Sequence, residues 1–220
     1  MSLLGIMKIL RLPPVIRALA FDVDLTLYTN AEYGQYQIDI LIKKAGELRG
    51  FSSEEMSGRI EDARKDWSLA NGGKKASLSN ALTTYGISME ENVRLREQLY
   101  EPEKYIKEDK RLRETLDKLS RSYTLGVVTN NPVLIARKTL AALGVSDLFP
   151  ILVGLDTCMV SKPHEKPFVK FSELSGCAPE TCVSVGDRYD IDLATPLEMG
   201  MGGILVDGVD DVYELAKFLL

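Results

Sequence analysis

Short apolar runs alternate with helical stretches along the second half of the chain, and this alternation restricts the fold more than any other feature. Strands are expected at residues 123–128, 151–153, 182–185 and 204–206, with helical patterns before, between and after them. An earlier apolar run at residues 15–21 predicts one more strand. Strands and helices that alternate in this way form a parallel sheet with right-handed crossovers and helices on both faces. We therefore predict an α/β fold with a doubly wound parallel sheet.

Residues 31–101 have a different character and predict an inserted helical domain. Ile38, Leu41 and Ala45 recur at helical spacing, and no convincing strand interrupts the segment. Ser52 and Glu55 have the spacing of a capping box, which predicts the start of a second helix. The sequence thus divides into a core formed by residues 1–30 and 102–220 and a small α-helical cap formed by residues 31–101.

The first predicted strand ends in two acids, Asp22 and Asp24. Alternate side chains of an extended chain share a face, so both carboxylates are expected to point the same way. Two carboxylates at such short range repel each other unless a cation or a shared proton relieves them, and Mg²⁺ prefers oxygen ligands of this kind. The pair indicates a Mg²⁺ site. A strand end in which one Asp caps a turn and the other is solvated would have the same sequence.

The second and third strands are followed by groups suited to an anion. Thr129 precedes Asn131 and Pro132, which predict a helix with Asn131 as its N-cap and proline at its first position. Free backbone N–H groups and the helix dipole favour an anion at such a place. Lys162 could neutralise a phosphate oxygen together with a nucleophile, or be an ordinary surface lysine. The only histidine, His164, is expected in a loop or at a helix start and not in catalysis.

The fourth strand ends in Gly186 and Asp187. Because glycine permits a tight turn, Asp187 is expected at the strand tip, beside the acids of the first strand. Asp192 falls one turn into the following helix, and Asp190 is expected to cap that helix. Ligands of parallel sheets bind at the carboxyl ends of the strands, so the functional site is expected among these residues.

Taken in order, these strand ends resemble the four motifs of the haloacid dehalogenase superfamily. The matching residues are Asp22, Asp24 and Thr26, then Thr129, then Lys162, and finally Gly186, Asp187 and Asp192. Lys162-Pro163 followed by Phe168 is also similar to a pattern of the family. The resemblance spans most of the chain outside the helical insertion. Two positions depart from it: Leu25 stands where Gly or Asn is frequent, and Pro196 where a small helical residue is usual.

The resemblance implies a Rossmann-like core with a helical cap and a magnesium-dependent phosphatase activity. In this chemistry Asp22 attacks phosphorus and forms an aspartyl phosphate, while Asp24 acts first as acid and then as base. The expected ligands of Mg²⁺ are Asp22, Asp187 and the backbone carbonyl of Asp24. The resemblance further implies that Thr26, Thr129, Asn130 and Lys162 bind the substrate, and that Asp192 binds a metal-bound water or orients Lys162.

Several alternatives stay open at this stage. Asp24 argues against a dehalogenase or phosphonatase, whose leaving groups need no proton, and favours transfer from an oxygen ester. A phosphomutase similar to β-phosphoglucomutase, acting on a sugar phosphate, shares all four motifs, and so does a relative that binds phosphate without catalysis. Thr26-Leu27-Tyr28 resembles phosphoglycolate-phosphatase-like and nucleotidase-like members. We expect hydrolysis of a small phosphomonoester, whose identity the sequence does not specify.

Charge and composition disfavour two classes of binding partner, nucleic acids and membranes. The net charge is −5 and the basic residues are scattered, which disfavours nucleic-acid binding. No apolar run approaches the roughly 20 residues that span a bilayer, so no membrane partner is expected. Three cysteines without zinc-like spacing favour a reduced, cytoplasmic location. The expected partner is a small phosphate ester, and the protein is expected to be a monomer or a homodimer.

Three basic residues outside the motifs carry a weaker hypothesis. Lys74 and Lys75 follow Gly72-Gly73, and Arg188 follows Asp187; each could reach an anionic substrate. A solvated turn is the simpler interpretation of the two lysines. Trp67, in the insertion, is expected to pack rather than to stack on a base.

Overall fold

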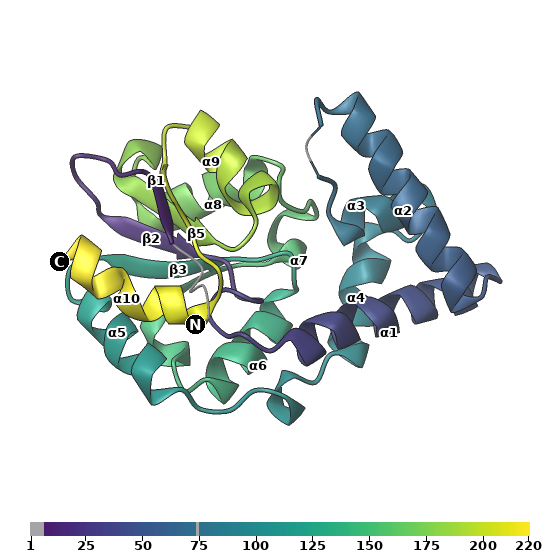
Figure 1. Cartoon of the computed structure of the whole chain (residues 1–220), viewed down its shortest axis with the longest axis horizontal. Coiled ribbons are helices and arrows are strands. Elements are labelled where there is room, and N and C mark those ends of the chain that lie inside the picture. Colours follow the sequence, from purple (N-terminus) through teal and green to yellow (C-terminus); the bar gives the residue numbers. More distant parts are fainter. Residues whose placement is uncertain (1–6, 74) are drawn as a thin grey trace, which may run out of the picture.

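The computed structural model describes residues 7–73 and 75–220, and within them a six-stranded sheet forms the centre of the molecule (Figure 1). The strand order is β1-β6-β5-β2-β3-β4. β1 runs antiparallel to β6, and all other neighbours are parallel. The strands are β1 Lys8–Arg11, β2 Ala18–Phe21, β3 Thr124–Val128, β4 Ile151–Val153, β5 Cys182–Gly186 and β6 Gly202–Leu205. The predicted α/β class is confirmed.

Helices cover both faces of this sheet. In Figure 1, α5 (Lys110–Ser120), α6 (Val133–Ala142) and α10 (Val209–Leu219) lie on one side, and α8 (Lys166–Ser175) and α9 (Ala194–Glu198) on the other. The period-two pattern of β2 explains the two layers. Leu19 and Phe21 join the hydrophobic cluster under the first group of helices, whereas Ala18 and Ala20 face the cluster that contains Phe168 of α8.

The insertion folds as helices alone, with α1 at Ala31–Arg49, α2 at Ser53–Ala70, α3 at Leu78–Thr84 and α4 at Met89–Leu99. The predicted capping box is present: Ser52 Oγ accepts from Glu55 N at 3.1 Å, and Glu55 Oε2 accepts from Ser52 N at 2.8 Å. Figure 1 shows the four helices grouped to one side of the sheet. The domain limits at residues 30 and 102 stay a prediction.

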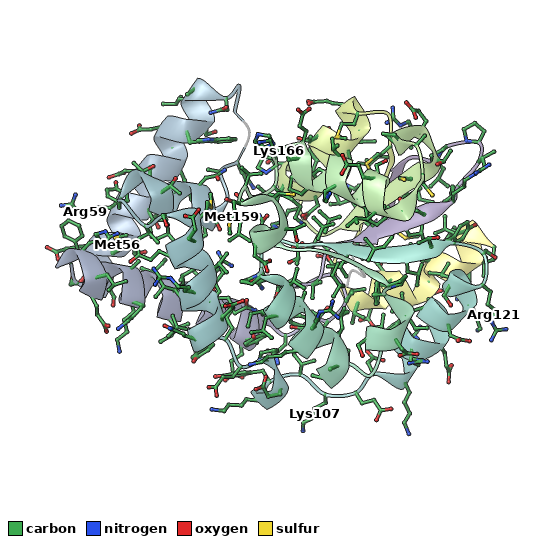
Figure 2. All side chains as sticks on the ribbon, turned by 180° about the vertical axis from the view of Figure 1, so that it is seen from behind. Met56, Arg59, Lys107, Arg121, Met159 and Lys166 are labelled. Atoms are coloured by element: carbon green, nitrogen blue, oxygen red, sulfur yellow. The ribbon has the colours of Figure 1, made fainter. Side chains whose placement is uncertain are left out.

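The cap has its own hydrophobic cluster. Met56 of α2 is fully buried there, while Arg59, one turn further along α2 at the outer surface, places its guanidinium 4.1 Å from the ring centre of Phe51 (Figure 2). Ile135, from the core helix α6, joins the same cluster. This contact ties the cap to the core beside the end of β3. In the described part of the chain, no helix is both long and apolar enough to cross a membrane.

Three local features were missed or misplaced. The edge strand β1 was missed because all four of its residues are exposed, so they show no alternation of apolar and polar positions. The first central strand begins at Ala18, not at Val15, which is 56% exposed after Pro13-Pro14. Short elements were also missed, among them α7 at Leu155–Cys158.

Two predicted helix caps were also wrong, and both errors concern the site. Pro132, not Asn131, occupies the N-cap of α6, and Asp156 of α7 accepts the hydrogen bond from Val133 N at 2.8 Å instead. Asp190 does not cap a helix, because it lies inside a π-helical turn at Tyr189–Leu193 that precedes α9. The side chain of Asn131 is thereby free for other contacts.

Candidate active site

Three adjacent parallel strands bring the predicted site residues to one edge of the sheet. Phe21 at the end of β2 is level with Val127 of β3 and with Val185 of β5. Asp22, Thr129 and Asp187 follow these strands and all line one cavity of about 230 Å³ between core and cap. The sheet register therefore assembles groups that are more than 160 residues apart in sequence.

A buried lysine joins two of the acids. Lys162 is 1% exposed, and its Nζ donates to Asp22 Oδ1 at 2.8 Å, to Asp192 Oδ1 at 2.7 Å and to the carbonyl of Val128 at 2.7 Å. Asn130 holds the loop of this lysine, because its Oδ1 accepts from Lys162 N at 2.7 Å. Lys162 thus contacts the carboxylate of Asp22 directly, in agreement with a role in neutralising that group.

Burial shifts the titration of these groups. Loss of water raises the pKa of Asp22 to about 7, although the charge of Lys162 lowers it in part. Burial likewise raises the pKa of Asp187 to about 6, although Arg188 opposes that shift. Burial would lower the pKa of Lys162, but Asp192 and Asp22 hold it above its usual value. Buried acids with raised pKa values at the carboxyl ends of parallel strands are typical of sites that bind a cation or a proton.

The chemistry of the acids fits a divalent metal ion. Asp22, Asp187 and Asp192 can each place one carboxylate oxygen within 4.8 Å of the others. Among the residues that the structure describes, Asp22 Oδ2 and Asp187 Oδ1 are buried oxygens without a hydrogen-bond partner. Unpaired buried carboxylate oxygens are costly, and a hard cation satisfies them. Asp192 belongs to the same cluster, but its oxygens already accept from Lys162 and from Arg188 N at 3.0 Å.

Asp24 lies at the cavity but turns its carboxylate to a different set of partners. Its Oδ1 accepts from Tyr28 Oη at 2.6 Å and from Gln37 Nε2 at 3.0 Å, and its Oδ2 accepts from Asn131 Nδ2 at 2.8 Å. The two acids of the first strand therefore have distinct surroundings. Asp22 faces Lys162 and the metal-type cluster, whereas Asp24 is held by neutral donors.

Several members of this network were missed by sequence reasoning. Gln37 comes from α1 of the cap, and Arg96 of α4 is 7% exposed and donates to Asn131 Oδ1 at 2.6 Å. Arg96 also donates to Asn92 Oδ1 at 2.7 Å, one helical turn earlier. In the sequence, the only sign of the Arg96 contacts is Asn92 four positions earlier. This spacing is also common on exposed helices, so it does not indicate a buried arginine.

The structure separates the remaining predicted residues. Thr129 and Asn130 line the cavity, whereas Thr26 is fully buried and does not line it, and its hydroxyl makes no hydrogen bond within residues 7–73 and 75–220. Leu25, at the position that departs from the family pattern, adopts a left-handed backbone with φ of 59° and lines the cavity. A leucine in this conformation is strained, as backbones at functional sites often are. Lys75 and Arg188 border a neighbouring cavity, and Lys74 lies outside the described residues.

Comparisons with known proteins agree with this geometry. Residues 19–206 match the family described as haloacid dehalogenase-like hydrolase. The phosphoglycolate phosphatase of Aquifex aeolicus is 28% identical over 179 residues, which cover 81% of this chain and 78% of that protein. The glyceraldehyde 3-phosphate phosphatase of Methanothermobacter thermautotrophicus is 32% identical over 92 residues, which cover 42% of this chain and 41% of that protein.

Solved structures show the same fold. A HAD phosphatase from Thermococcus onnurineus superposes with a TM-score of 0.60 at 23% identity, covering 93% of this chain and 98% of that one. The HAD-hydrolase YfnB from Bacillus subtilis, solved bound to magnesium, has a TM-score of 0.55 at 15% identity, covering 92% and 99% of the two chains. Together with the match over residues 19–206, these results show that the chain belongs to the haloacid dehalogenase-like hydrolases and is a hydrolase with phosphatase homologues.

Proposed function

We propose that this protein is a Mg²⁺-dependent phosphatase that hydrolyses a small phosphomonoester through an aspartyl phosphate on Asp22. One observation carries the proposal. Asp22 combines a carboxylate oxygen bound by Lys162 with a second, buried oxygen that accepts no hydrogen bond from the described residues, at a cavity that Asp24 also lines. A carboxylate that is fixed in this way directly after a strand is suited to in-line attack on phosphorus.

The metal is expected to lie between Asp22 and Asp187, with the backbone carbonyl of Asp24 as a further ligand. On each of the two carboxylates, one buried oxygen accepts no hydrogen bond from the described residues, which supports this assignment. When bound, Mg²⁺ would supply charge neutralisation between the carboxylates and the phosphate oxygens. Asp192 would act indirectly, through Lys162. It accepts a hydrogen bond from the Lys162 ammonium and so orients that group toward Asp22.

Thr129, Asn130 and Lys162 are expected to receive the phosphate. The Thr129 hydroxyl accepts from Asn131 N at 3.2 Å, which directs it into the turn between β3 and α6. This turn precedes a helix N-terminus, where backbone N–H groups favour an anion. Lys162 would balance the negative charge that develops when Asp22 attacks.

Asp24 is expected to protonate the leaving oxygen and then to take a proton from the attacking water. Tyr28, Gln37 and Asn131 hold its two oxygens from three directions. These contacts hold the carboxyl group in place at the cavity, where it would give up a proton in the first half of the reaction and take one in the second. Because Gln37 belongs to the cap, the position of α1 sets the orientation of the acid.

The family names point to small organic phosphates as substrates. Relatives that align with 81% of this chain carry the name phosphoglycolate phosphatase, so phosphoglycolate is the first candidate. A phosphomutase uses the same motifs and differs only in the fate of the phosphate.

The test is phosphate release from phosphoglycolate, glyceraldehyde 3-phosphate, a hexose phosphate and a nucleoside monophosphate, each with Mg²⁺ and with EDTA. Wild type should release phosphate only with Mg²⁺, Asp22→Asn should release none, and the control Asp117→Asn, at a surface carboxylate, should match wild type. Isomerisation of the hexose phosphate without release would identify a mutase. Undiminished release by Asp22→Asn would refute the covalent role.

A further inference from the structure

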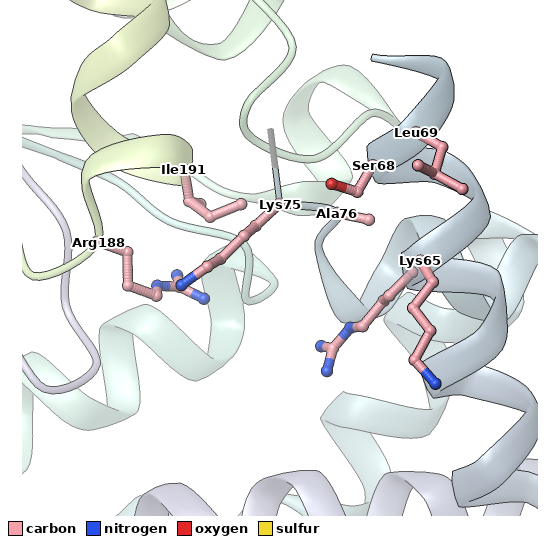
Figure 3. Close-up of a pocket in the computed structure, with 8 residues that line it drawn as sticks. Lys65, Ser68, Leu69, Lys75, Ala76, Arg188 and Ile191 are labelled. Carbon is pink, nitrogen blue, oxygen red and sulfur yellow. The ribbon is translucent and has the colours of Figure 1, made fainter. Parts of the chain in front are cut away.

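A second, larger cavity adjoins the candidate active site. It has a volume of about 720 Å³ and lies between α2 and the segment before α3 on the cap side and the Asp187 loop on the core side. Figure 3 shows the side chain of Lys75 extending from the cap segment toward the loop that carries Arg188. Arg64 and Arg188 line both this cavity and the catalytic one, so the two spaces are continuous along these side chains.

Positive charge dominates the wall of this cavity. Arg64, Lys65, Lys75 and Arg188 all border it, and no carboxylate does so among the residues that the structure describes. Two of the four cations have partners: Lys65 lies 3.4 Å from Asp62, and Arg188 lies 3.7 Å from Asp187. The other two, Arg64 and Lys75, form no ion pair within residues 7–73 and 75–220. Two of the four cationic groups at this cavity, those of Arg64 and Lys75, are therefore not neutralised by an ion pair with a described residue.

Arg64 is the clearest sign of a missing partner. Its Nε is buried and makes no hydrogen bond to any described residue. Burial lowers the pKa of this guanidinium and the nearby positive charge of Arg188 lowers it further, whereas the charge of Glu61, which does not border the cavity, opposes the shift only in part. A buried guanidinium N–H without a hydrogen-bond acceptor, beside another cation, is destabilising unless an anion binds there. Guanidinium and ammonium groups that converge in this way are suited to a carboxylate or a phosphate.

The rest of the wall is mostly apolar and consists of Leu69, Ala76 and Ile191 together with the hydroxyl-bearing Ser68. Such a wall fits the carbon chain of a substrate rather than a second hydrated ion. The larger cavity is also not needed for the ester phosphate, because Thr129 and Asn130, two of the expected phosphate-binding residues, line the catalytic cavity of about 230 Å³.

Resting on the proposed phosphatase function, we propose that Arg64 and Lys75, with Arg188, form a second anion site that selects the substrate. The preferred substrate is then a phosphomonoester with a distal carboxylate or phosphate on a short carbon linker, so that the ester phosphate lies at Asp22 and the second anion lies in the larger cavity. Esters with an uncharged tail bind without this contact.

Binding of inert analogues tests the site without requiring turnover. With Mg²⁺ present and at constant ionic strength, calorimetry compares 4-phosphonobutyrate and butane-1,4-bisphosphonate with butylphosphonate, whose tail is uncharged. Wild type should bind the two-anion probes roughly tenfold more tightly or better, as expected for charge-assisted hydrogen bonds. The preferred probe distinguishes a distal carboxylate from a distal phosphate.

Two separate variants and one control decide the assignment. Arg64→Gln and Lys75→Gln should each lose most of the preference for the two-anion probes. Lys75→Gln, at a residue that does not line the catalytic cavity, should also still bind butylphosphonate like wild type. Lys43→Gln, which removes a cap charge away from both cavities, should keep the preference. Equal affinity of all probes in wild type, retention of the preference in both cavity variants, or its loss in Lys43→Gln would overturn the proposal.

Steady-state kinetics separates this proposal from the function on which it rests. Replacing Lys75, which borders the larger cavity and not the catalytic one, should raise KM for two-anion esters at similar kcat and leave p-nitrophenyl phosphate hydrolysis unchanged. Replacing Arg64 should also raise KM for two-anion esters. Failure of the phosphatase function would be seen as no release from any ester by wild type, whatever the binding preference. Failure of the second site would be seen as release that neither variant alters.

Discussion

Replacing Lys162 by methionine tests the central ionic contact of the site. Methionine keeps a similar length and volume but removes the charge that Asp22 and Asp192 share. Lys162 is 1% exposed, so both carboxylates lose their cation in a dry environment. Breaking a buried ion pair of this kind costs about 3–5 kcal/mol. That is a large part of the roughly 5–15 kcal/mol by which a typical domain is stable.

The expected cost depends on pH in a defined direction. Burial already raises the pKa of Asp22 to about 7, and removing Lys162 removes the interaction that lowers it. The folded variant therefore binds protons more tightly than its unfolded chain, whose carboxyl has a pKa of about 3.9. An acid with a raised pKa in the folded state destabilises the fold as the pH rises. The difference between variant and wild type should thus be largest near pH 8 and smaller near pH 5.5.

Urea unfolding followed by far-UV circular dichroism measures this difference, in EDTA so that metal binding does not contribute. The matched control is Lys166→Met, at an exposed lysine four residues along, which should change stability by less than about 0.5 kcal/mol. A loss below about 1 kcal/mol for Lys162→Met at pH 8, or an equal loss at both pH values, would refute the argument that a buried charge network holds the strand ends together.

Three further predictions concern the acids and the turn that carries them. Asp24→Asn should slow phosphate release about 10²–10⁴-fold while Mg²⁺ affinity measured by calorimetry stays unchanged, and normal turnover would exclude its role as acid and base. Mg²⁺ affinity of wild type should rise with pH from about 5 to 8, because Asp22 and Asp187, with pKa values of about 7 and about 6, must lose protons to bind the ion; calorimetry showing no pH dependence would contradict this. Gly186→Ala should cost about 1–3 kcal/mol in urea unfolding and reduce activity, since the new Cβ would lie 2.5 Å from Cβ of Asp192; wild-type stability and activity would show that the turn can yield.

Much of the core could be predicted from local patterns. The strands β3, β4 and β5 follow apolar runs bounded by turn residues, and burial on both faces makes such runs conspicuous. β1 was not predictable in this way, because an exposed edge strand at the end of the sheet needs no apolar face. Its pairing with β6 arises only once the sheet exists.

The site residues likewise fall into those that local patterns predict and those that depend on tertiary contacts. Asp22, Thr129, Lys162 and Asp187 could be predicted as site residues because each stands just after a strand or in a motif of fixed order. Asn131 was misassigned because local rules for helix starts compete with tertiary contacts. Its amide donates to Asp24 at 2.8 Å, while Asp156, 25 positions further along the chain, supplies the cap.

The sequence by itself determined the alternation of strands and helices, the helical insertion and the acids at the strand ends. These depend on neighbours within a few residues, whose periodicity and turn preferences are visible along the chain. Only the tertiary structure decided that Gln37 and Arg96 of the cap hold the groups around Asp24, and that Arg64 and Lys75 face Arg188 across a cavity. Such contacts join residues that come together only when the cap packs on the core. Because the partners are far apart in the sequence, local residue spacing does not predict them.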